Sequence, residues 1–427
     1  MKHLKKLLCG LLAAALMLCA LPAAALAEGA PAQPTRTEPL DLSEVTQETD
    51  MLASEGWKWE PGETEATLTL RNCYISVNDA ASAIIFPGKS GKDYHVTLVL
   101  EGANILETSS AVQGPMVTNK PSPVANMNVT IRAQAGASLH ILCPVPQAAP
   151  VRMPYGFAAN SITLESGDIY SNTTFCIADK NVDIRGGSLT IEANHPLAES
   201  SYYDAQDGIY SRVGNVNISG GTVSIDVGRN AIFVPGDAAQ NEEQAVKITG
   251  GDVTLKAGHA NNSQNCIGIA AKNIVIDTDG KVDIYGRDTA LAIWKENGRA
   301  ELIKAGTGFS LTQAETSPYD LIFSKSPDTT TTTIGNANYS AVDAAEAQAK
   351  ALNAGDYKDF SAVTAALAAV DRNKNLLQQG EVDAMAQAIL DAIAGLEKKP
   401  APTPAPAPQA PAADAGQKAN PKTGVAK

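Results

Sequence analysis

A short pattern recurs eight times between Ala83 and Leu311: two runs of alternating apolar and polar residues, joined by a pair of glycines. The clearest copies read NVDIRGGSLTI, NVNISGGTVSI and AVKITGGDVTL, and they begin at Asn181, Asn215 and Ala245. Alternation with a period of two is typical of half-buried strands. Regular repetition of such a unit predicts a stacked, repetitive architecture rather than one globular core.

A third short apolar run precedes most of the paired runs, for example at 176–178, 208–210 and 231–233. Three strands per turn predict a mainly β fold, a parallel β-helix, which we place at residues 51–326 with about nine coils. The glycine pairs at Gly186 and Gly220 are 34 residues apart, more than three short strands need. We therefore expect loops to protrude from the coils, and a functional site to lie on them.

Stacking is required because a single coil cannot bury its valines and isoleucines alone. Each inward position should align with the equivalent positions above and below it, and each strand should hydrogen-bond to the next turn. The glycines suit the bends because they adopt positive φ without steric cost. The ends of a solenoid also need cover, and Trp57 and Trp59 are placed to cap the first coil.

The N-terminus reads as an export signal. Lys2, Lys5 and Lys6 precede an apolar run and a small-residue site, which predicts a signal peptide at residues 1–27. A proline-containing tether is expected at 28–50. The mature chain has no apolar run of membrane-spanning length, so we expect a secreted, extracellular or cell-wall protein.

The charge of the chain limits its possible partners, and the positions of its cysteines limit its possible disulfides. Loss of the three signal lysines would change the formal charge from −13 to −16, which disfavours a nucleic-acid partner. Four cysteines remain in the mature chain, and their separation along the coils predicts buried free thiols rather than disulfides. They are Cys73, Cys143, Cys176 and Cys266.

The pattern changes after Leu311. A threonine-rich linker is expected at 327–337 and a three-helix module at 338–398, with Ser340 and Asp343 as a capping box at its start. Apolar residues spaced by three and four predict the second and third helices. Residues 399–427 alternate proline and alanine, which predicts an extended stalk, and they end in the sequence Asn420-Pro421-Lys422-Thr423-Gly424.

Three resemblances follow from these motifs. The GWKW segment at Gly56 and the glycine-paired coils resemble secreted bacterial carbohydrate-binding proteins built on a right-handed parallel β-helix, over about residues 56–311. Membership would imply binding of acidic or plant-type polysaccharide, with calcium in some members. The module at 338–398 resembles FIVAR-type helical modules of surface proteins. The NPKTG sequence resembles a sortase motif, which would imply cell-wall anchoring through Thr423 and contact with peptidoglycan, although the usual apolar tail is missing.

The longest loop, Asn194 to Asp207, is the best local candidate for a site. Its tyrosine rings could stack on sugars, and its carboxylates could hold a calcium ion, which prefers oxygen ligands. The alternative is a loop that lies back on its own solenoid. The predicted ligand-binding residues are Tyr202, Tyr203, Asp204, Asp207 and Arg212, and the predicted metal ligands are Asp204 and Asp207.

Other surface groups are weaker candidates. Arg185, Arg212, Arg229 and Arg287 recur near coil edges and could bind carboxylates of an acidic polysaccharide. Solvated surface charge is the alternative for each arginine. Trp294 could be a stacking platform or a cap on the last coils.

Catalysis is the main rival interpretation. Polysaccharide lyases and hydrolases also use this fold, and a hydrolase needs two opposed carboxylates. The sequence contains no recognisable set of this kind, although distant coils could supply one. We therefore expect a non-catalytic polysaccharide-binding protein, with a lyase or hydrolase acting on acidic polysaccharide as first alternative and an adhesin or structural surface stalk as second.

Overall fold

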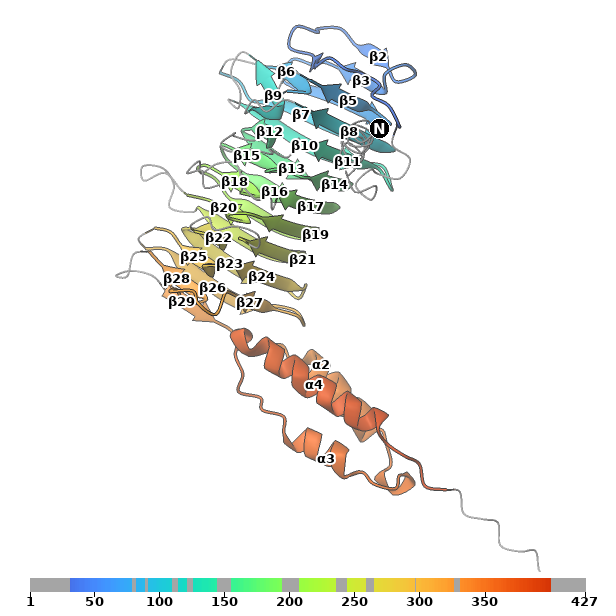
Figure 1. Cartoon of the computed structure of the whole chain (residues 1–427), viewed down its shortest axis with the longest axis vertical. Coiled ribbons are helices and arrows are strands. Elements are labelled where there is room, and N and C mark those ends of the chain that lie inside the picture. The colour runs from blue at the N-terminus through green and yellow to red at the C-terminus, as the bar shows by residue number, and fades with distance from the viewer. Residues whose placement is uncertain are drawn as a thin grey trace, which may run out of the picture.

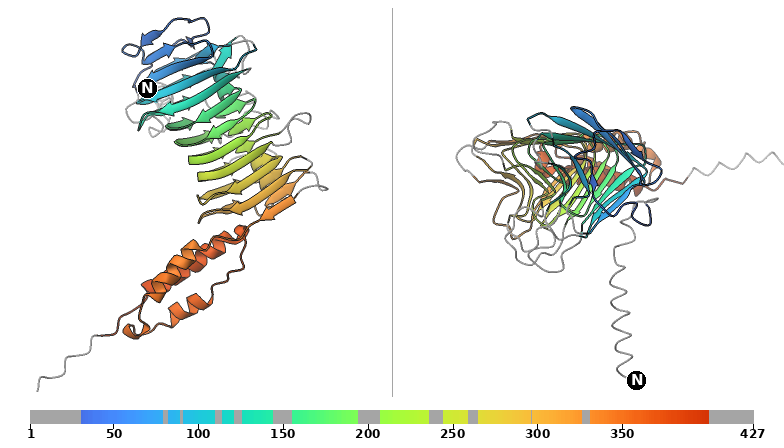
Figure 2. Two further views of the ribbon diagram at one scale, coloured as in Figure 1. Left: turned by 180° about the vertical axis from the view of Figure 1, so that it is seen from behind. Right: turned by 90° about the horizontal axis from the view of Figure 1, so that it is seen from above.

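The computed structural model describes residues 31–78, 82–88, 91–109, 114–120, 126–143, 155–193, 207–235, 244–258, 265–295, 297–325 and 331–400. The predicted signal peptide and most of the stalk lie outside these residues. The described chain forms a β-rich rod followed by helices (Figure 1). The predicted fold class is confirmed: the molecule is a β-solenoid with three helices at its C-terminal end (Figure 2).

The solenoid has three parallel ladders of strands, which we call ladders 1, 2 and 3. Ladder 1 contains β4 (Glu65–Arg71), β7 (Tyr94–Glu101), β10 (Met127–Ala133), β13 (Ser161–Leu164), β16 (Val182–Ile184), the first parts of β19 (Val216–Val227) and β21 (Ala245–Ala257), β23 (Asn273–Asp277), β26 (Arg299–Lys304) and β29 (Thr331–Ile334). Ladder 2 contains β5 (Tyr74–Val77), β8 (Ala103–Thr108), β11 (Ser138–Leu142), β14 (Asp168–Ser171), β17 (Ser188–Ala193), the second parts of β19 and β21, β24 (Val282–Gly286) and β27 (Ser310–Thr312).

Ladder 3 is a separate 10-stranded sheet. Its strands are β1 (Leu40–Asp41), β6 (Ile84–Pro87), β9 (Pro115–Lys120), β12 (Tyr155–Ala159), β15 (Cys176–Ala178), β18 (Ile209–Ser211), β20 (Ile232–Phe233), β22 (Ile267–Ala271), β25 (Thr289–Ile293) and β28 (Ile322–Ser324). The solenoid has about seven turns. The repeats predict a higher count of about nine coils.

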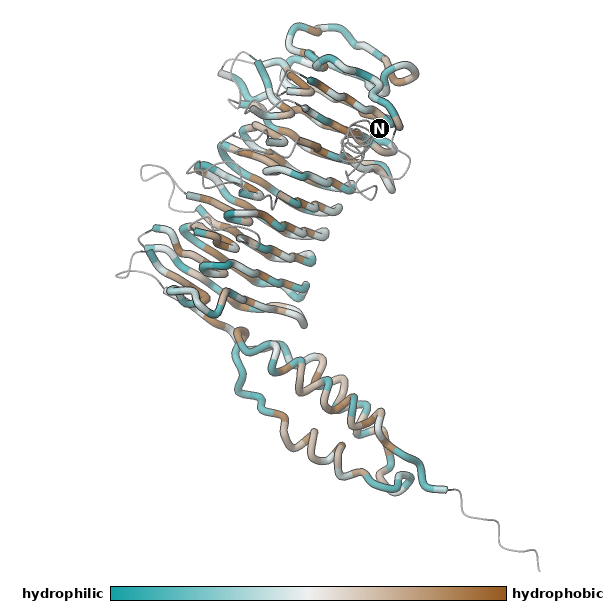
Figure 3. Tube along the Cα trace, viewed as in Figure 1, coloured by the Kyte–Doolittle hydropathy of each residue, from teal (hydrophilic) through white to brown (hydrophobic). Residues whose placement is uncertain are grey.

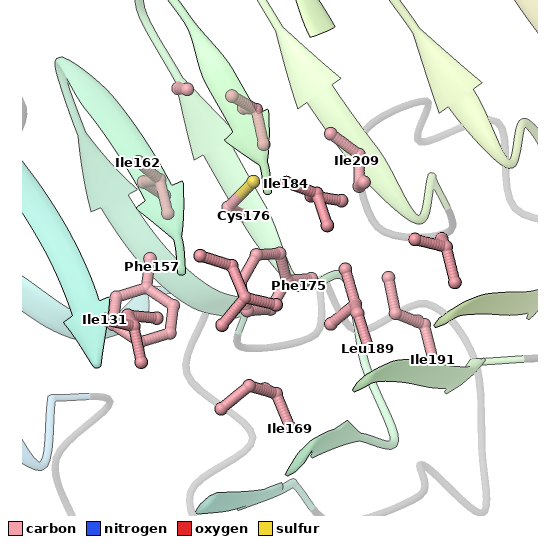
Figure 4. Packing of buried hydrophobic residues seen from close by; sticks show 14 of the residues in the cluster. Ile131, Phe157, Ile162, Ile169, Phe175, Cys176, Ile184, Leu189, Ile191 and Ile209 are labelled. Atoms are coloured by element: carbon pink, nitrogen blue, oxygen red, sulfur yellow. The ribbon is translucent and has the colours of Figure 1, made fainter. Parts of the chain in front are cut away.

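The interior consists of continuous apolar columns, as the repeats predict. Val182 pairs in register with Val216, and Val216 with Val246. These side chains are at most 1% exposed, because each turn covers the turn before it. Apolar segments recur on successive turns of the rod in Figure 3, and Figure 4 shows residues such as Ile184 and Leu189 converging between the sheets.

The glycine bends are stacked as well. Gly187, Gly221 and Gly251 have φ values of 76°, 79° and 81°. A Cβ atom on Gly221 would lie 2.5 Å from the carbonyl oxygen of Gly187 in the preceding turn. The bend therefore needs glycine twice over, for its backbone conformation and for the close approach of successive turns.

The N-terminal end is capped as expected, but by more of the chain. The strand β3 (Trp57–Glu60) pairs antiparallel with β4 and with β2 (Thr49–Met51). Trp59 is fully buried against Phe86, with ring centroids 5.7 Å apart. The expected tether at 28–50 is wrong for its second half, because β1 pairs in parallel with β6 and β2 joins the cap.

The C-terminal helices also pack on the solenoid. They are α2 (Ser340–Lys350), α3 (Ser361–Ala368) and α4 (Gln379–Ala394), with short 3-10 helices η1 (Ala354–Asp356) and η2 (Leu376–Gln378). Leu376 is fully buried in the solenoid core, and the Asp383 carboxylate accepts a hydrogen bond from the backbone N–H of Gly308 at 3.0 Å. The short helix η2 and the start of α4 therefore contact the last turns of the rod, and the rest of the helical module extends away from it (Figure 1).

Two details of this region differ from the expectations. Part of the expected linker at 327–337 is the strand β29, which pairs with β26 because its threonines suit an edge strand. The capping box at Ser340 is absent, and the backbone N–H of Ser340 instead donates to the Asn338 side chain at 2.9 Å. A capping box does occur at η2, between Asn375 and Gln378.

The four cysteines of the described chain are buried thiols that form no disulfide bond. Burial raises the pKa of the Cys73 thiol and of the Cys143 thiol to about 12. Burial also raises the pKa of Cys176. These thiols act as small apolar side chains of the core.

Candidate functional site

Asp207 has a structural role, because its side chain binds other residues inside the fold. Its side chain is fully buried, and its Oδ1 accepts hydrogen bonds from the backbone N–H of Asn230 at 3.2 Å and from Asn230 Nδ2 at 2.9 Å. Its Oδ2 lies 3.5 Å from an Arg229 guanidinium nitrogen. These contacts hold the start of β18 against the next turn, so the Asp207 carboxylate does not face a ligand at the surface.

Tyr202, Tyr203 and Asp204, the remaining residues predicted in this loop, lie outside the described residues, as does Thr423. Within the described ranges, no group of three or more histidine, cysteine, aspartate or glutamate side chains could hold a metal ion. The calcium prediction therefore stays a prediction about the loop.

The four predicted arginines all have acidic neighbours within the protein. Arg212 is 60% exposed and pairs with Asp179 at 3.1 Å. Arg229 was expected to be exposed, but only 12% of its side chain is accessible, because it reaches back to the buried Asp207. The other pairs are Arg185 with Asp183 at 3.4 Å and Arg287 with Asp288 at 3.3 Å.

A more extended candidate lies on the outer face of ladder 3. Register places one side chain of each successive strand in a single outward column, which we call the ring column. Its members do not belong to the interior core, and several form a separate apolar cluster on the outside of the sheet. The column consists of Ile177, Tyr210, Phe233, Ala270, Ala292 and Phe323.

A second outward column runs beside the first, two residues further along each strand. The backbone N–H groups of Arg212, Trp294 and Lys325 continue the ladder hydrogen bonds, at 2.9, 2.9 and 3.1 Å. Lys272 occupies the equivalent position after β22. We call Arg212, Lys272, Trp294 and Lys325 the donor column, because each carries an N–H donor.

The rings of the two columns pack against one another. Tyr210 and Phe233 have centroids 5.5 Å apart, and Phe233 meets Trp294 edge to face at 5.7 Å. Tyr319 lies 4.2 Å from Phe323. Tyr210, Trp294 and Phe323 remain partly exposed, so the cluster presents aromatic surface to solvent.

Cations border these rings. The Lys325 Nζ lies 3.6 Å from the centroid of the Trp294 ring, and the Arg229 guanidinium lies 5.4 Å from that of Phe233. Such contacts are electrostatically favourable because the face of an aromatic ring is negative. The first of them holds the Lys325 ammonium group over one face of the Trp294 ring.

The outer face of ladder 2 carries a different group. His140 and Tyr170 stack with centroids 5.3 Å apart, and the Tyr170 hydroxyl donates to Glu192 at 3.0 Å. Burial, followed by the nearby Glu192 charge, raises the pKa of Tyr170 to about 12. The phenol therefore stays protonated and its hydrogen-bonding capacity is used within the protein.

Glu165 is an acidic group with a shifted pKa on the solenoid surface, where it belongs to an ion pair. A hydrogen bond from Arg132 lowers the pKa of Glu165, which also lies 3.9 Å from Arg185. Perturbed carboxylates can mark catalytic sites, but surface ion-pair networks perturb them in the same way. Glu165 fits the second explanation.

Apart from Trp294, sequence reasoning missed the rings of the two columns, although the sequence contains a signal for them. An isoleucine is followed directly by an aromatic residue at Ile209-Tyr210, Ile232-Phe233, Ile293-Trp294 and Ile322-Phe323. In a strand, adjacent residues point to opposite faces. The repeated pair thus predicts an inward isoleucine and an outward ring.

The fold and this face define the class of the molecule as a parallel β-solenoid with an aromatic outer surface. No protein-family model, no curated protein and no solved structure matches the chain. Among the described helices, none has both the length and the apolarity required for a membrane span.

Proposed function

We propose that this protein binds polysaccharide non-catalytically through the outer face of ladder 3. The observation that carries the proposal is the ring column with the donor column beside it. A sugar ring has an apolar face, which can pack on Tyr210, Trp294 or Phe323, and a rim of hydroxyls, which can accept hydrogen bonds from neighbouring N–H groups. Sites for small molecules combine apolar and aromatic lining with a few placed polar groups in this way.

The proposal includes an exported location. The basic and apolar N-terminal segment supports secretion, and the proline-rich stalk with Thr423 supports attachment to the cell wall, which would place the solenoid near peptidoglycan. Tyr202, Tyr203 and Asp204 of the 194–207 loop could extend the binding surface, since that loop directly precedes β18 in the sequence.

Binding is favoured over catalysis because of the chemistry of this face. A glycosidase needs a carboxylic acid and a carboxylate on opposite sides of the bond that it cleaves. The described members of the two columns are apolar, aromatic or N–H donors, and the one carboxylate beside them, Asp179, is paired with Arg212 at 3.1 Å. A lyase or hydrolase acting on acidic polysaccharide therefore remains the alternative, and an adhesin or structural stalk the second.

A pull-down on insoluble polysaccharides, with and without calcium, tests the proposal. The wild-type chain should be retained on at least one polysaccharide, with no reducing or unsaturated sugars released. Phe323→Ala and Trp294→Ala should each reduce retention, since a lost stacking ring weakens binding by about 1 kcal/mol, or roughly fivefold. Tyr170→Ala, an outward aromatic residue on ladder 2, is the matched control and should be retained normally.

Three other outcomes would contradict this proposal. Release of sugar products would support the enzyme. Equal loss of retention in the Tyr170 variant would move the site to ladder 2. Absence of retention on every polysaccharide tested would leave the adhesin or stalk.

A further inference from the structure

We infer that the ligand is an internal stretch of a linear, flat polysaccharide chain, which lies parallel to the axis of the solenoid. This inference rests on the proposed function and specifies the ligand class for the same face. It contrasts with recognition of one terminal sugar, which would need a pocket at a single level of the rod.

The aromatic rings lie at several levels of ladder 3. The strands β18, β20, β22, β25 and β28 are consecutive neighbours in ladder 3. Tyr210, Phe233, Trp294 and Phe323 come from the first, second, fourth and fifth of them. The partly exposed rings of Tyr210, Trp294 and Phe323 are therefore spread along the axis, and the buried Phe233, Ala270 and Ala292 fill the ring column between its two ends.

The outer face of ladder 3 is longer along the axis of the rod than across it. Successive levels are about 4.8 Å apart, so five levels extend over roughly 19 Å. Across the rod, the strands β18 and β20 have only 3 and 2 residues. The two outward columns are then about 7 Å apart. A chain that crossed the rod would meet one or two side chains, whereas a chain along the axis would meet the three partly exposed rings, Tyr210, Trp294 and Phe323.

The spacing between levels of the solenoid matches the advance per sugar in an extended polysaccharide. In an extended pyranose chain with equatorial linkages, one sugar advances by a distance close to the rung spacing of about 4.8 Å. Successive sugars can therefore lie over successive levels without losing register. A strongly coiled polysaccharide would leave the face after one or two levels.

The cations of the donor column are regularly spaced along the axis. Arg212, Lys272 and Lys325 follow the strands β18, β22 and β28, that is, every second level. A flat chain with two-fold character presents the same edge at every second sugar. Each cation would thus meet an equivalent hydroxyl or carboxylate group, which is the kind of acceptor that ammonium and guanidinium groups bind best.

Calorimetry with oligosaccharides of defined length tests this inference. Cello-oligosaccharides and xylo-oligosaccharides, from the dimer to the octamer, are the flat probes, and malto-oligosaccharides of equal length are the coiled controls. Affinity for a flat series should rise with each added sugar up to about the pentamer and then level off, because five levels are available. The malto-hexamer should bind at least about tenfold more weakly than the flat hexamer.

Two variants locate the chain on the face. Tyr210→Ala and Phe323→Ala remove the first and the last aromatic ring of the ring column. Each should weaken hexamer binding by about fivefold to tenfold. A trimer covers about three levels, so it can use one end and should lose affinity in only one of the two variants. Thermal unfolding of both variants verifies that the solenoid is intact.

The outcomes separate this inference from the proposed function. If polysaccharide is retained but a dimer binds as tightly as a hexamer, the inference of a chain along the axis is wrong. The face would then bind single sugars or pairs of sugars. Equal affinity for the coiled series, or retention of polysaccharide without binding of either flat series, also overturns it. Failure to retain any polysaccharide overturns the proposed function itself.

Discussion

The rings of Phe233 and Trp294 meet edge to face, with centroids 5.7 Å apart and an interplanar angle of 83°, although a whole strand separates their own strands in the sheet. That strand, β22, carries the fully buried Ala270 in the ring column. The small side chain allows the two rings to lean together over it. The aromatic surface thus depends on a residue that has no ring.

The first prediction concerns Ala270. Ala270→Leu would force a larger side chain under the rings and should lower the free energy of unfolding by about 1–3 kcal/mol. It should also reduce polysaccharide retention, because the rings move apart. Urea unfolding and pull-down measure the two effects. Val275→Leu, on the outer face of ladder 1, should change neither, and a similar loss of retention there would contradict this explanation.

A second prediction separates the two reasons for glycine in the bends. Gly221→Ala should lower the free energy of unfolding by more than about 1 kcal/mol, since alanine is strained at positive φ and its Cβ would clash with Gly187. Gly91→Ala is the matched control: Gly91 has a φ of 72°, but a Cβ there would meet no atom within 4 Å. It should show the conformational cost alone. Equal losses would mean that stacking contributes nothing.

The third prediction tests the contact between the helical module and the solenoid. Leu376→Ala should cost about 2–5 kcal/mol, the usual cost of removing a buried leucine, because Leu376 is fully buried in the solenoid core. Hydrogen exchange should quicken first in β26 and β29. The adjacent Leu377 is 36% exposed, and Leu377→Ala should change stability by less than about 0.5 kcal/mol. Unchanged exchange in the Leu376 variant would show that the helices do not support the last turns.

A fourth prediction concerns alkaline pH. Burial raises the pKa of Cys73 and Cys143 from 9.0 to about 12 in the folded protein. Above pH 9 the unfolded chain releases these protons while the folded chain retains them, so the free energy of unfolding should fall as pH rises toward 12. The slope is at most about 1.4 kcal/mol per pH unit for each thiol.

Urea midpoints measured across this range check the thiol prediction. Below pH 9 the two thiols should contribute no pH dependence, because both states hold the proton. Cys143→Ala should make the alkaline decline less steep. An unchanged slope would assign the decline to the buried tyrosines instead, since the pKa of Tyr94 is also raised to about 12 by burial.

The architecture was predictable because it is encoded in local repeats. The alternation in copies such as 181–191 and 215–225 sets inward and outward faces, and the stacked register Val182–Val216–Val246 follows from it. The end caps were only partly predictable. Trp57 and Trp59 indicated a cap, but the pairing of β1 and β2 and the docking of Leu376 depend on contacts between residues far apart in the chain.

The candidate site was harder to predict, because it also depends on contacts between residues far apart in the chain. Asp207 and Arg229 both looked like surface groups in the sequence, whereas the fold buries Asp207 completely and leaves Arg229 12% exposed. Solvent exposure of a polar residue between strands is decided by the neighbouring turns, which a single repeat does not specify.

By itself, the sequence determined the strand period, the glycine bends and the buried cysteine thiols, because each depends on side-chain pattern or separation within the chain. Only the tertiary structure decided that Tyr210, Phe233, Trp294 and Phe323 share one outer face. These residues are scattered over more than a hundred positions. They meet because parallel register brings each turn directly onto the next.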